Sequence, residues 1–195
     1  MKKVLLSALI SCFAFGIYAQ TYYSEDFSGG LGQFTSTDSD ADGFEWQAYD
    51  YGDGQGNVAT SASWDGNAGP LTPDNWLISS AIDLTSATGN IALEWLVMAQ
   101  DQSWADENYT VYVATANDTA ALSASTIFFN EIIGTSTGYM SRSLDVSSFA
   151  GQTIYVGYRH HNCTDWFMMN LDDIIVRSVQ ADDAGVSDLT LDAFI

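Results

Sequence analysis

The chain has 195 residues, of which 25 are acidic and only five are lysine or arginine, so its formal net charge is −20 at pH 7. A chain this acidic lacks the basic patches that nucleic acids and anionic membrane surfaces require, which argues against both as partners. The length suffices for one domain with a sizeable core.

The first 19 residues predict a signal peptide. Met1-Lys2-Lys3 is basic, residues 4–17 are largely apolar, and Ile17-Tyr18-Ala19 fits a small-residue cleavage site. The apolar run is too short to span a membrane and no second such run follows, so we expect an exported protein without membrane insertion. An alternative is a lipoprotein signal, because Leu9-Ile10-Ser11-Cys12 resembles a lipobox.

Cleavage after Ala19 leaves three arginines against all 25 acidic residues. Divalent cations would relieve the self-repulsion of so acidic a domain. Cys12 leaves with the signal peptide, so Cys163 stays without an intramolecular disulfide partner. An exported domain without a disulfide takes its stability from core area or from metal.

Short alternating apolar runs predict β-strands separated by Gly, Asp, Asn and Ser turns. In chain order the candidates cover 22–27, 58–62, 76–79, 91–99, 109–115, 127–131, 139–144, 154–158 and 171–179. Only 118–124 predicts a helical turn. About ten strands of this kind predict an antiparallel β-sandwich.

The loop Asp38-Ser39-Asp40-Ala41-Asp42-Gly43 places three carboxylates on alternate residues before a glycine. Such carboxylates converge in a tight loop, and oxygen-only ligation suits Ca²⁺. An EF-hand loop starts in the same way, but Tyr49 stands where its bidentate Glu is expected, and no amphipathic helices flank the loop. We therefore predict a Ca²⁺ loop of another kind; the alternative is a solvated acidic turn.

The chain has six tryptophans, more than a core of this size usually needs, so some of them are candidates for ligand binding. Trp76 and Trp95 lie in apolar strands and are expected in the core. Trp64 and Trp104 lie in polar loops, where exposed rings would offer flat stacking faces beside acids and amides, as sugar recognition requires. The alternative is that both rings pack back over the edges of the sandwich.

The segment Arg159-His160-His161-Asn162-Cys163 suggests zinc or nucleophilic chemistry. Adjacent histidines on a strand point to opposite faces, however, and the spacing of zinc ligands is poor. Cys163 also has no identified orienting group. We therefore expect a strand end with a surface histidine pair, and Arg159 paired with a nearby carboxylate.

No catalytic signature such as GxSxG or HExxH occurs, so we do not expect an enzyme. A carboxylate pair for glycoside hydrolysis is defined by its separation in space, which the sequence does not give.

An ordered set of segments goes beyond a generic sandwich. The set comprises Glu25-Asp26-Phe27, residues 38–43 with Trp46, residues 73–79 with Asp83-Leu84, Trp95 with Ala99-Gln100-Asp101, residues 107–113, residues 156–160, Thr164-Asp165 and residues 171–174. In order and spacing it resembles the cleaved-adhesin domains that follow the protease domain of gingipains and occur in haemagglutinins. It is also similar to the choice-of-anchor J modules of secreted Bacteroidetes proteins. The resemblance runs from about Ser24 to Val179.

The resemblance implies a jelly-roll β-sandwich, similar to MAM domains and carbohydrate-binding modules, with one or two structural Ca²⁺ ions. It further implies secreted or cell-surface adhesion to host proteins, haemoproteins or glycans rather than catalysis. Such proteins often end in a sorting domain for type IX secretion. We expect residues 181–195, which are acidic and lack strand rhythm, to be a linker to a further C-terminal segment.

The first and last strands of a jelly roll are often neighbours, so both are expected to meet the acidic loop. The expected Ca²⁺ ligands are Glu25, Asp38, Asp40, Asp42, Asp172 and Asp173. Asp172 and Asp173 point to opposite faces of a strand, so only a bulge would let both serve. The resemblance suggests a second cation site or a ligand-facing loop at Asp101, Asp106 and Glu107; the alternative is an exposed acidic hairpin.

These observations predict a signal peptide over 1–19 and a monomeric, all-β jelly-roll domain over 20–180. We expect a calcium-stabilised adhesin-type module, secreted or on the outer cell surface, that binds a host or environmental protein or glycan. Two alternatives stay open. One is a carbohydrate-binding accessory module of a larger enzyme, with Trp64 and Trp104 as the binding residues. The other is a structural spacer of a surface protein.

Overall fold

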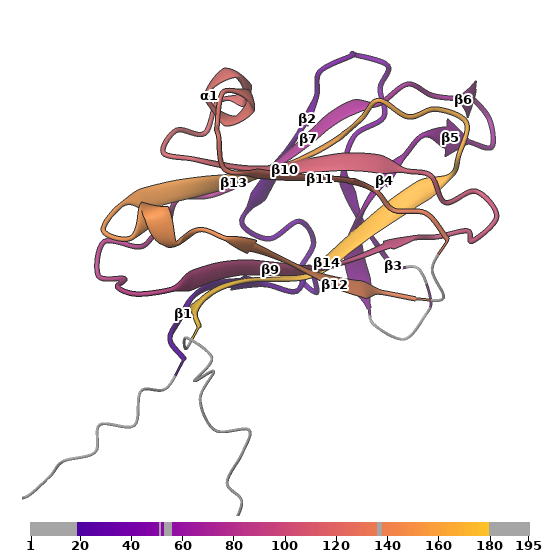
Figure 1. Cartoon of the computed structure of the whole chain (residues 1–195). Helices are drawn as coiled ribbons and strands as arrows, with labels where there is room; N and C mark the ends of the chain where they lie inside the picture. The colour runs from indigo at the N-terminus through magenta and orange to yellow at the C-terminus, as the bar shows by residue number, and fades with distance from the viewer. Residues whose placement is uncertain (1–18, 51, 53–55, 136–137, 180–195) are drawn as a thin grey trace, which may run out of the picture.

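Two antiparallel sheets packed face to face make up the fold in the computed structural model (Figure 1). The structure describes residues 19–50, 52, 56–135 and 138–179. The expected signal peptide, apart from Ala19, and the expected linker over 181–195 lie outside these residues. Within them, no helix has the length and apolar character that a membrane crossing requires.

The first sheet has the strand order β12-β9-β14-β4-β3, with β1 also paired to β14. Its strands are β1 (Thr21–Glu25), β3 (Gln47–Asp50), β4 (Asn57–Ala62), β9 (Ile91–Ala99), β12 (Met140–Asp145) and β14 (Met168–Ser178). The first and last strands are therefore neighbours, as a jelly roll predicts, and Glu25 pairs with Ile174.

The second sheet has the order β11-β10-β13-β7-β2, with β8 paired to β13. Its strands are β2 (Phe34–Asp38), β7 (Asp74–Ser79), β8 (Ile82–Asp83), β10 (Asn108–Ala114), β11 (Phe128–Ile132) and β13 (Thr153–His161). A small ribbon joins β5 (Trp64–Asp65) to β6 (Gly69–Pro70). The predicted helical turn is α1 (Thr119–Ser123), whose N-cap Asp118 accepts from the Ala121 N–H at 2.8 Å; a 3-10 turn covers Ser147–Phe149.

The core lies between the sheets and contains the apolar positions that the alternation predicts. On β9, Leu93, Trp95 and Val97 are buried, and on β13 Val156 and Tyr158 face them. Full burial of one large apolar side chain contributes about 1.5–3 kcal/mol, so each of these side chains stabilises the fold. Trp76 and Trp95 are both buried, as expected.

A β-bulge in β14 explains why the apolar rhythm of this strand is broken. The register against β9 shifts between Asp172 and Ile175, and Asp173 has a left-handed φ of 45°. The extra residue leaves Leu171 and Ile174 both buried although they are three positions apart. Asp173 is turned out to solvent, whereas Asp172 stays buried.

Candidate functional site

The acidic loop after β2 brings its three aspartates together, as predicted. Carboxylate oxygens of Asp38, Asp40 and Asp42 lie within 4.8 Å of one another. The Asp38 carboxylate holds the turn by accepting from the backbone N–H groups of Ala41 at 2.7 Å and Gly43 at 2.9 Å. The backbone of Ala41 has a φ of 58° and that of Gly43 a φ of 88°, so two left-handed residues close the loop.

The electrostatics of this loop show the cost of gathering carboxylates. The Gly43 N–H, followed by that of Ala41, lowers the pKa of Asp38. Partial burial, followed by the neighbouring Asp38 carboxylate, raises the pKa of Asp40. A cation between the oxygens would remove this conflict, because an opposite charge favours the ionised form of both groups.

The structure separates Glu25 from this loop, so the expectation that they share one ion is not met. Glu25 Oε2 accepts from the Gln33 N–H at 3.0 Å and Oε1 from the Phe27 N–H at 3.0 Å. Gln33 immediately precedes β2, whereas Asp38 ends it. Five strand residues span roughly 16 Å, which places the two carboxylates at opposite ends of β2.

Glu25 instead lies beside the bulge of β14. A cavity of about 310 Å³ is lined by Ser24, Glu25, Asp26, Asp173 and Ile175. Asp172 does not line this cavity: it is buried, and its carboxylate accepts from the Asp173 N–H at 2.8 Å. The predicted ligands thus fall into two places, one at the acidic loop and one at the β1–β14 edge.

The expected grouping of Asp101, Asp106 and Glu107 is not found. The Asp101 carboxylate accepts from the Ser103 N–H at 2.7 Å, and Asp106 is exposed. Glu107 is fully buried and points into the sandwich. The second cation site and the exposed acidic hairpin both misplace Glu107. The ligand-facing loop agrees with the structure at Asp101, which lines a cavity, but not at the buried Glu107.

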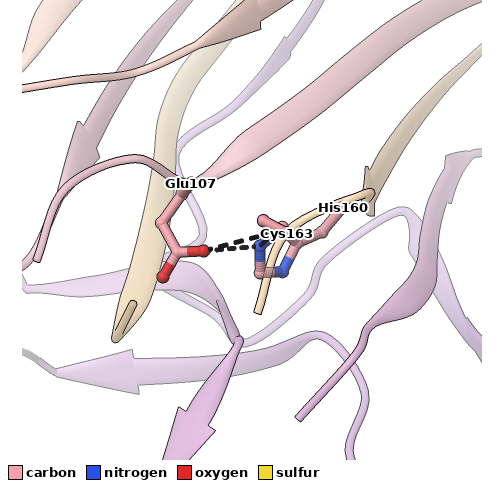
Figure 2. A group of neighbouring side chains, drawn as sticks. All are labelled: Glu107, His160 and Cys163. Atoms are coloured by element: carbon pink, nitrogen blue, oxygen red, sulfur yellow. Dashed lines mark hydrogen bonds and ion pairs between the residues drawn. The ribbon is translucent and has the colours of Figure 1, made fainter. Parts of the chain in front are cut away.

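Glu107 is the centre of a buried polar cluster with His160 and Cys163 (Figure 2). His160 Nε2 lies 3.0 Å from Glu107 Oε2 and 3.1 Å from Cys163 Sγ, and Cys163 Sγ lies 3.4 Å from Glu107 Oε2. His160 comes from the end of β13, and the turn after it, where Asn162 has a φ of 55°, returns Cys163 to the same point.

The expectation of a surface histidine pair is wrong, because both rings are buried. They do point to opposite faces, as expected: His160 faces Glu107, whereas His161 Nε2 lies 2.8 Å from Thr110 Oγ1. Burial, followed by the charge of Arg159, lowers the pKa of His161 to about 4.

The environment of the cluster controls its charges. Burial acts to raise the pKa of Glu107, but the hydrogen bond from His160, followed by those from the Phe167 N–H and the Ser63 hydroxyl, holds it below its usual value. Burial, followed by the Glu107 charge, raises the pKa of the Cys163 thiol. The thiol by itself is therefore a poor nucleophile at neutral pH.

Arg159 forms the expected ion pair with a carboxylate. Its Nε and Nη2 lie 2.6 Å and 2.8 Å from the two oxygens of Asp74, and the guanidinium carbon lies 5.2 Å from the ring centroid of Trp76. The pair borders an outer cavity of about 310 Å³ that His161 and Cys163 also line.

Trp64 and Trp104 meet at one aromatic cavity, although they lie far apart in the sequence. The cavity, of about 360 Å³, is lined by Trp64, Asp101, Trp104, Asp165, Trp166 and Phe167. The Trp64 ring packs against Phe167 at 5.9 Å and the Trp104 ring against Trp166 at 6.3 Å between centroids. Trp104 remains 52% exposed, so its face is open to a ligand.

Sequence reasoning missed Trp166 and Phe167 in this cavity, and it missed the Glu107–His160–Cys163 cluster. The cavity residues come from a third loop whose approach depends on the fold. The cluster carries a signal in the sequence, because Glu107 and His160 continue the buried parity of β10 and β13.

The comparisons with known proteins point in one direction. The family model described as Cleaved Adhesin Domain matches residues 20–176. Hemagglutinin A of Porphyromonas gingivalis is 33% identical over 178 residues, covering 81% of this chain. Lys-gingipain W83 of the same organism is also 33% identical over 178 residues. The chain spans only 8% of the haemagglutinin and 10% of the gingipain.

Solved structures agree with the sequence comparison. The K3 cleaved adhesin domain of Lys-gingipain from Porphyromonas gingivalis W83 is 29% identical with a TM-score of 0.69, covering 83% of this chain and all of that domain. A carbohydrate-binding module solved with β-1,4-galactotriose has a TM-score of 0.52 at 8% identity, covering 80% of this chain and 97% of that one. The second likeness shows a shared jelly-roll fold.

Proposed function

The chain belongs to the cleaved adhesin domain family, and from this premise we propose that it is a non-catalytic, adhesin-type binding module whose ligand contacts the aromatic cavity. The observation that carries the proposal is the meeting of Trp64, Trp104 and Trp166 at one open cavity. Aromatic rings supply large contact area at low cost in conformational entropy, which is why they dominate binding hot spots. The adjacent carboxylates of Asp101 and Asp165 supply hydrogen-bond acceptors.

Carbohydrate recognition is the second candidate function, and the same cavity favours it. Flat indole faces stack on the C–H faces of sugar rings, while Asp101 and Asp165 can accept from hydroxyl groups. Relatives of the fold include the module solved with β-1,4-galactotriose. A glycan ligand would suit an adhesin and would equally suit an accessory module attached to an enzyme. The domain to which this module is joined would then distinguish the two functions.

We place the protein outside the cell or on its outer surface. The predicted signal peptide over 1–19 and membership of the cleaved adhesin domain family support this location.

Calcium is proposed to stabilise the module at two places. At the first, Asp38, Asp40 and Asp42 already gather their oxygens within 4.8 Å of one another. At the second, Glu25, Asp26 and Asp173 line one cavity. Both donor sets consist of oxygen alone, the chemistry that a hard cation requires. Calcium there would hold the turn after β2 and fasten β1 to the bulge of β14.

A binding screen tests the proposal. The folded protein is applied to arrays of glycans and of extracellular proteins beside the Trp104→Ala and Trp64→Ala variants. Phe128→Ala is the matched control, because Phe128 is 54% exposed on β11 and does not line the aromatic cavity. We expect a ligand that both tryptophan variants lose and the control retains. Binding that all three variants retain equally would overturn the assignment of the cavity.

A further inference from the structure

In the Glu107–His160–Cys163 cluster, a carboxylate oxygen and a sulfur atom both contact the same ring nitrogen of His160. His160 Nε2 faces Glu107 Oε2 at 3.0 Å and Cys163 Sγ at 3.1 Å. A ring nitrogen carries either one proton or one lone pair, so it serves one of these partners well and the other poorly. We propose that Glu107 Oε2, His160 Nε2 and Cys163 Sγ instead bind one Zn²⁺ ion placed between them.

The distances within the cluster suit tetrahedral coordination. Zinc binds oxygen and nitrogen ligands at about 2.0–2.2 Å and thiolate at about 2.3 Å, so two ligands of one ion lie about 3.3–3.6 Å apart. The three separations here are 3.0, 3.1 and 3.4 Å. Side-chain shifts of about half an ångström or less admit the ion, and the mixture of nitrogen, sulfur and oxygen ligands selects zinc over calcium.

Neighbouring groups already orient the proposed ligands. His160 Nδ1 lies 2.8 Å from Ser61 Oγ, which also accepts from Asn75 Nδ2 at 3.2 Å. A proton on Nδ1, donated to Ser61, leaves the Nε2 lone pair for the metal. Glu107 Oε1 accepts from the Ser63 hydroxyl at 2.9 Å and the Phe167 N–H at 2.8 Å, which leaves Oε2 free for coordination.

Charge and geometry favour a metal over a nucleophilic cysteine. A relay from thiol to imidazole to carboxylate uses both ring nitrogens, one for each partner. Here the thiol and the carboxylate share Nε2, while Nδ1 contacts a serine. With Zn²⁺ bound, a thiolate, a carboxylate and a neutral imidazole form an electrically neutral group, which removes the cost of burying an unpaired charge.

The site has a route to solvent on one side. Glu107 and His160 are fully buried, but Cys163 is only partly buried and lines the outer cavity beside Thr72 and Asn162. Three protein ligands leave a fourth position, and on this side of the cluster water can reach it.

Cobalt substitution tests the proposal with a direct spectroscopic readout. Cys163 is the single cysteine outside residues 1–19, so a thiolate-to-cobalt charge-transfer band in the mature chain reports on it alone. The protein is stripped with a chelator and titrated with Co²⁺ in excess CaCl₂, which keeps the acidic sites filled. We expect one equivalent of Co²⁺ to produce the band and Zn²⁺ to displace it.

Matched variants locate the site. His160→Gln and Cys163→Ser should abolish the band, whereas His161→Gln should retain it, because His161 faces Thr110 on the other side of β13. Ser61→Ala keeps all three ligands and should weaken metal affinity on the order of 10–100-fold.

If the variants of the metal ligands do not fold, the reactivity of the Cys163 thiol in the wild-type protein tests the proposal. Bound Zn²⁺ should slow the reaction of Cys163 with a disulfide reagent, and a chelator should restore it. A folded wild-type protein that gives neither the cobalt band nor zinc protection of the thiol would overturn the proposal, as would a band that folded His160→Gln retains.

Discussion

The Trp95 indole N–H donates a hydrogen bond to the Tyr109 hydroxyl at 3.0 Å, joining the two sheets through the core. Trp95 belongs to β9 of the first sheet and Tyr109 to β10 of the second. The Tyr109 hydroxyl donates in turn to Glu131 at 2.7 Å, and Glu131 also accepts from Arg142 Nε at 2.9 Å. This chain of hydrogen bonds ties the centre of the core to an ion pair near the surface.

Replacing Tyr109 by phenylalanine should therefore destabilise the domain. The change leaves the buried Trp95 N–H without its acceptor and removes a donor from Glu131, and an unsatisfied buried polar group costs about 1–3 kcal/mol. Urea unfolding of the wild type and Tyr109→Phe measures the loss as a lower midpoint with an unchanged slope.

Tyr158→Phe is the matched control for this prediction. Tyr158 is equally buried, but its hydroxyl has no hydrogen-bond partner within the described part of the chain. Removing that hydroxyl should be neutral or stabilising. Equal losses for the two variants would show that the hydrogen bond to Trp95 contributes nothing beyond shape.

A side chain at Gly32 should destabilise the domain, because the left-handed backbone and the neighbouring Glu25 carboxylate both oppose a Cβ there. Its φ is 58°, and a Cβ there would collide with the carboxylate of Glu25. The left-handed backbone alone costs an L-residue about 1–2 kcal/mol. Moving the Glu25 carboxylate aside also breaks its hydrogen bonds from the Phe27 and Gln33 N–H groups, each of which contributes about 0.5–1.5 kcal/mol. Gly32→Ala should thus lower the free energy of unfolding, measured by urea, by more than one backbone penalty.

Gly89→Ala isolates the backbone part of this effect. Gly89 has a φ of 76°, but no atom lies within 4 Å of an added Cβ. If Gly32→Ala costs no more than Gly89→Ala, the packing of Glu25 against the backbone at Gly32 is not tight in solution.

Calcium should raise the melting temperature of the domain. A ligand bound only by the folded state at a hundred times its dissociation constant adds about 2.7 kcal/mol, which corresponds to roughly 5–10 °C for a domain of this size. We expect CaCl₂ to give this rise over EDTA in a thermal scan. Asp38→Asn/Asp40→Asn should lose one part of it and Asp173→Asn another.

Asp83→Asn serves as the control for the calcium experiment. Asp83 holds an exposed turn by accepting from Thr85 and belongs to neither carboxylate group, so the variant should respond to calcium as the wild type does. Wild-type melting curves that coincide in CaCl₂ and EDTA would show that neither carboxylate group binds calcium.

The sequence predicts the central strands well because their buried faces produce a regular alternation of apolar residues. Every apolar residue of β9 from Ile91 to Ala99 on the alternating face is buried, as predicted. The missed strands β2 and β3 lie at sheet edges, where one flank faces solvent and the residues, Phe34–Asp38 and Gln47–Asp50, are mostly polar. Hydrophobic periodicity does not detect such strands.

The missed strand β2 also explains the error over Glu25. The jelly roll that the family resemblance implies correctly predicts that the first and last strands are neighbours, and Glu25 lies beside the β14 bulge. Without β2, however, nothing shows that a full strand separates Glu25 from Asp38. The sequence identifies both carboxylates as candidate ligands, but it does not show the path of the chain between them.

The buried cluster shows where alternation could have been extended. Tyr109 and Val111 share their face with Glu107, and Val156 and Tyr158 share theirs with His160, so parity alone places both polar residues in the core. Glu107 and His160 come together because β10 pairs with β13 in a register that places Tyr109 opposite His160. That pairing is a property of the sheet topology, and no local pattern encodes it.

The most direct test of the binding account is a titration of the ligand identified in the array screen into the wild type, Trp104→Ala and Phe128→Ala. Calorimetry and tryptophan fluorescence measure the binding. A ligand stacked in the aromatic cavity should change the fluorescence of the wild type and of the control. Loss of one stacking aromatic at a hot spot costs about 2 kcal/mol or more, so Trp104→Ala should weaken affinity roughly thirtyfold. An affinity for Trp104→Ala equal to that of the wild type would contradict the account.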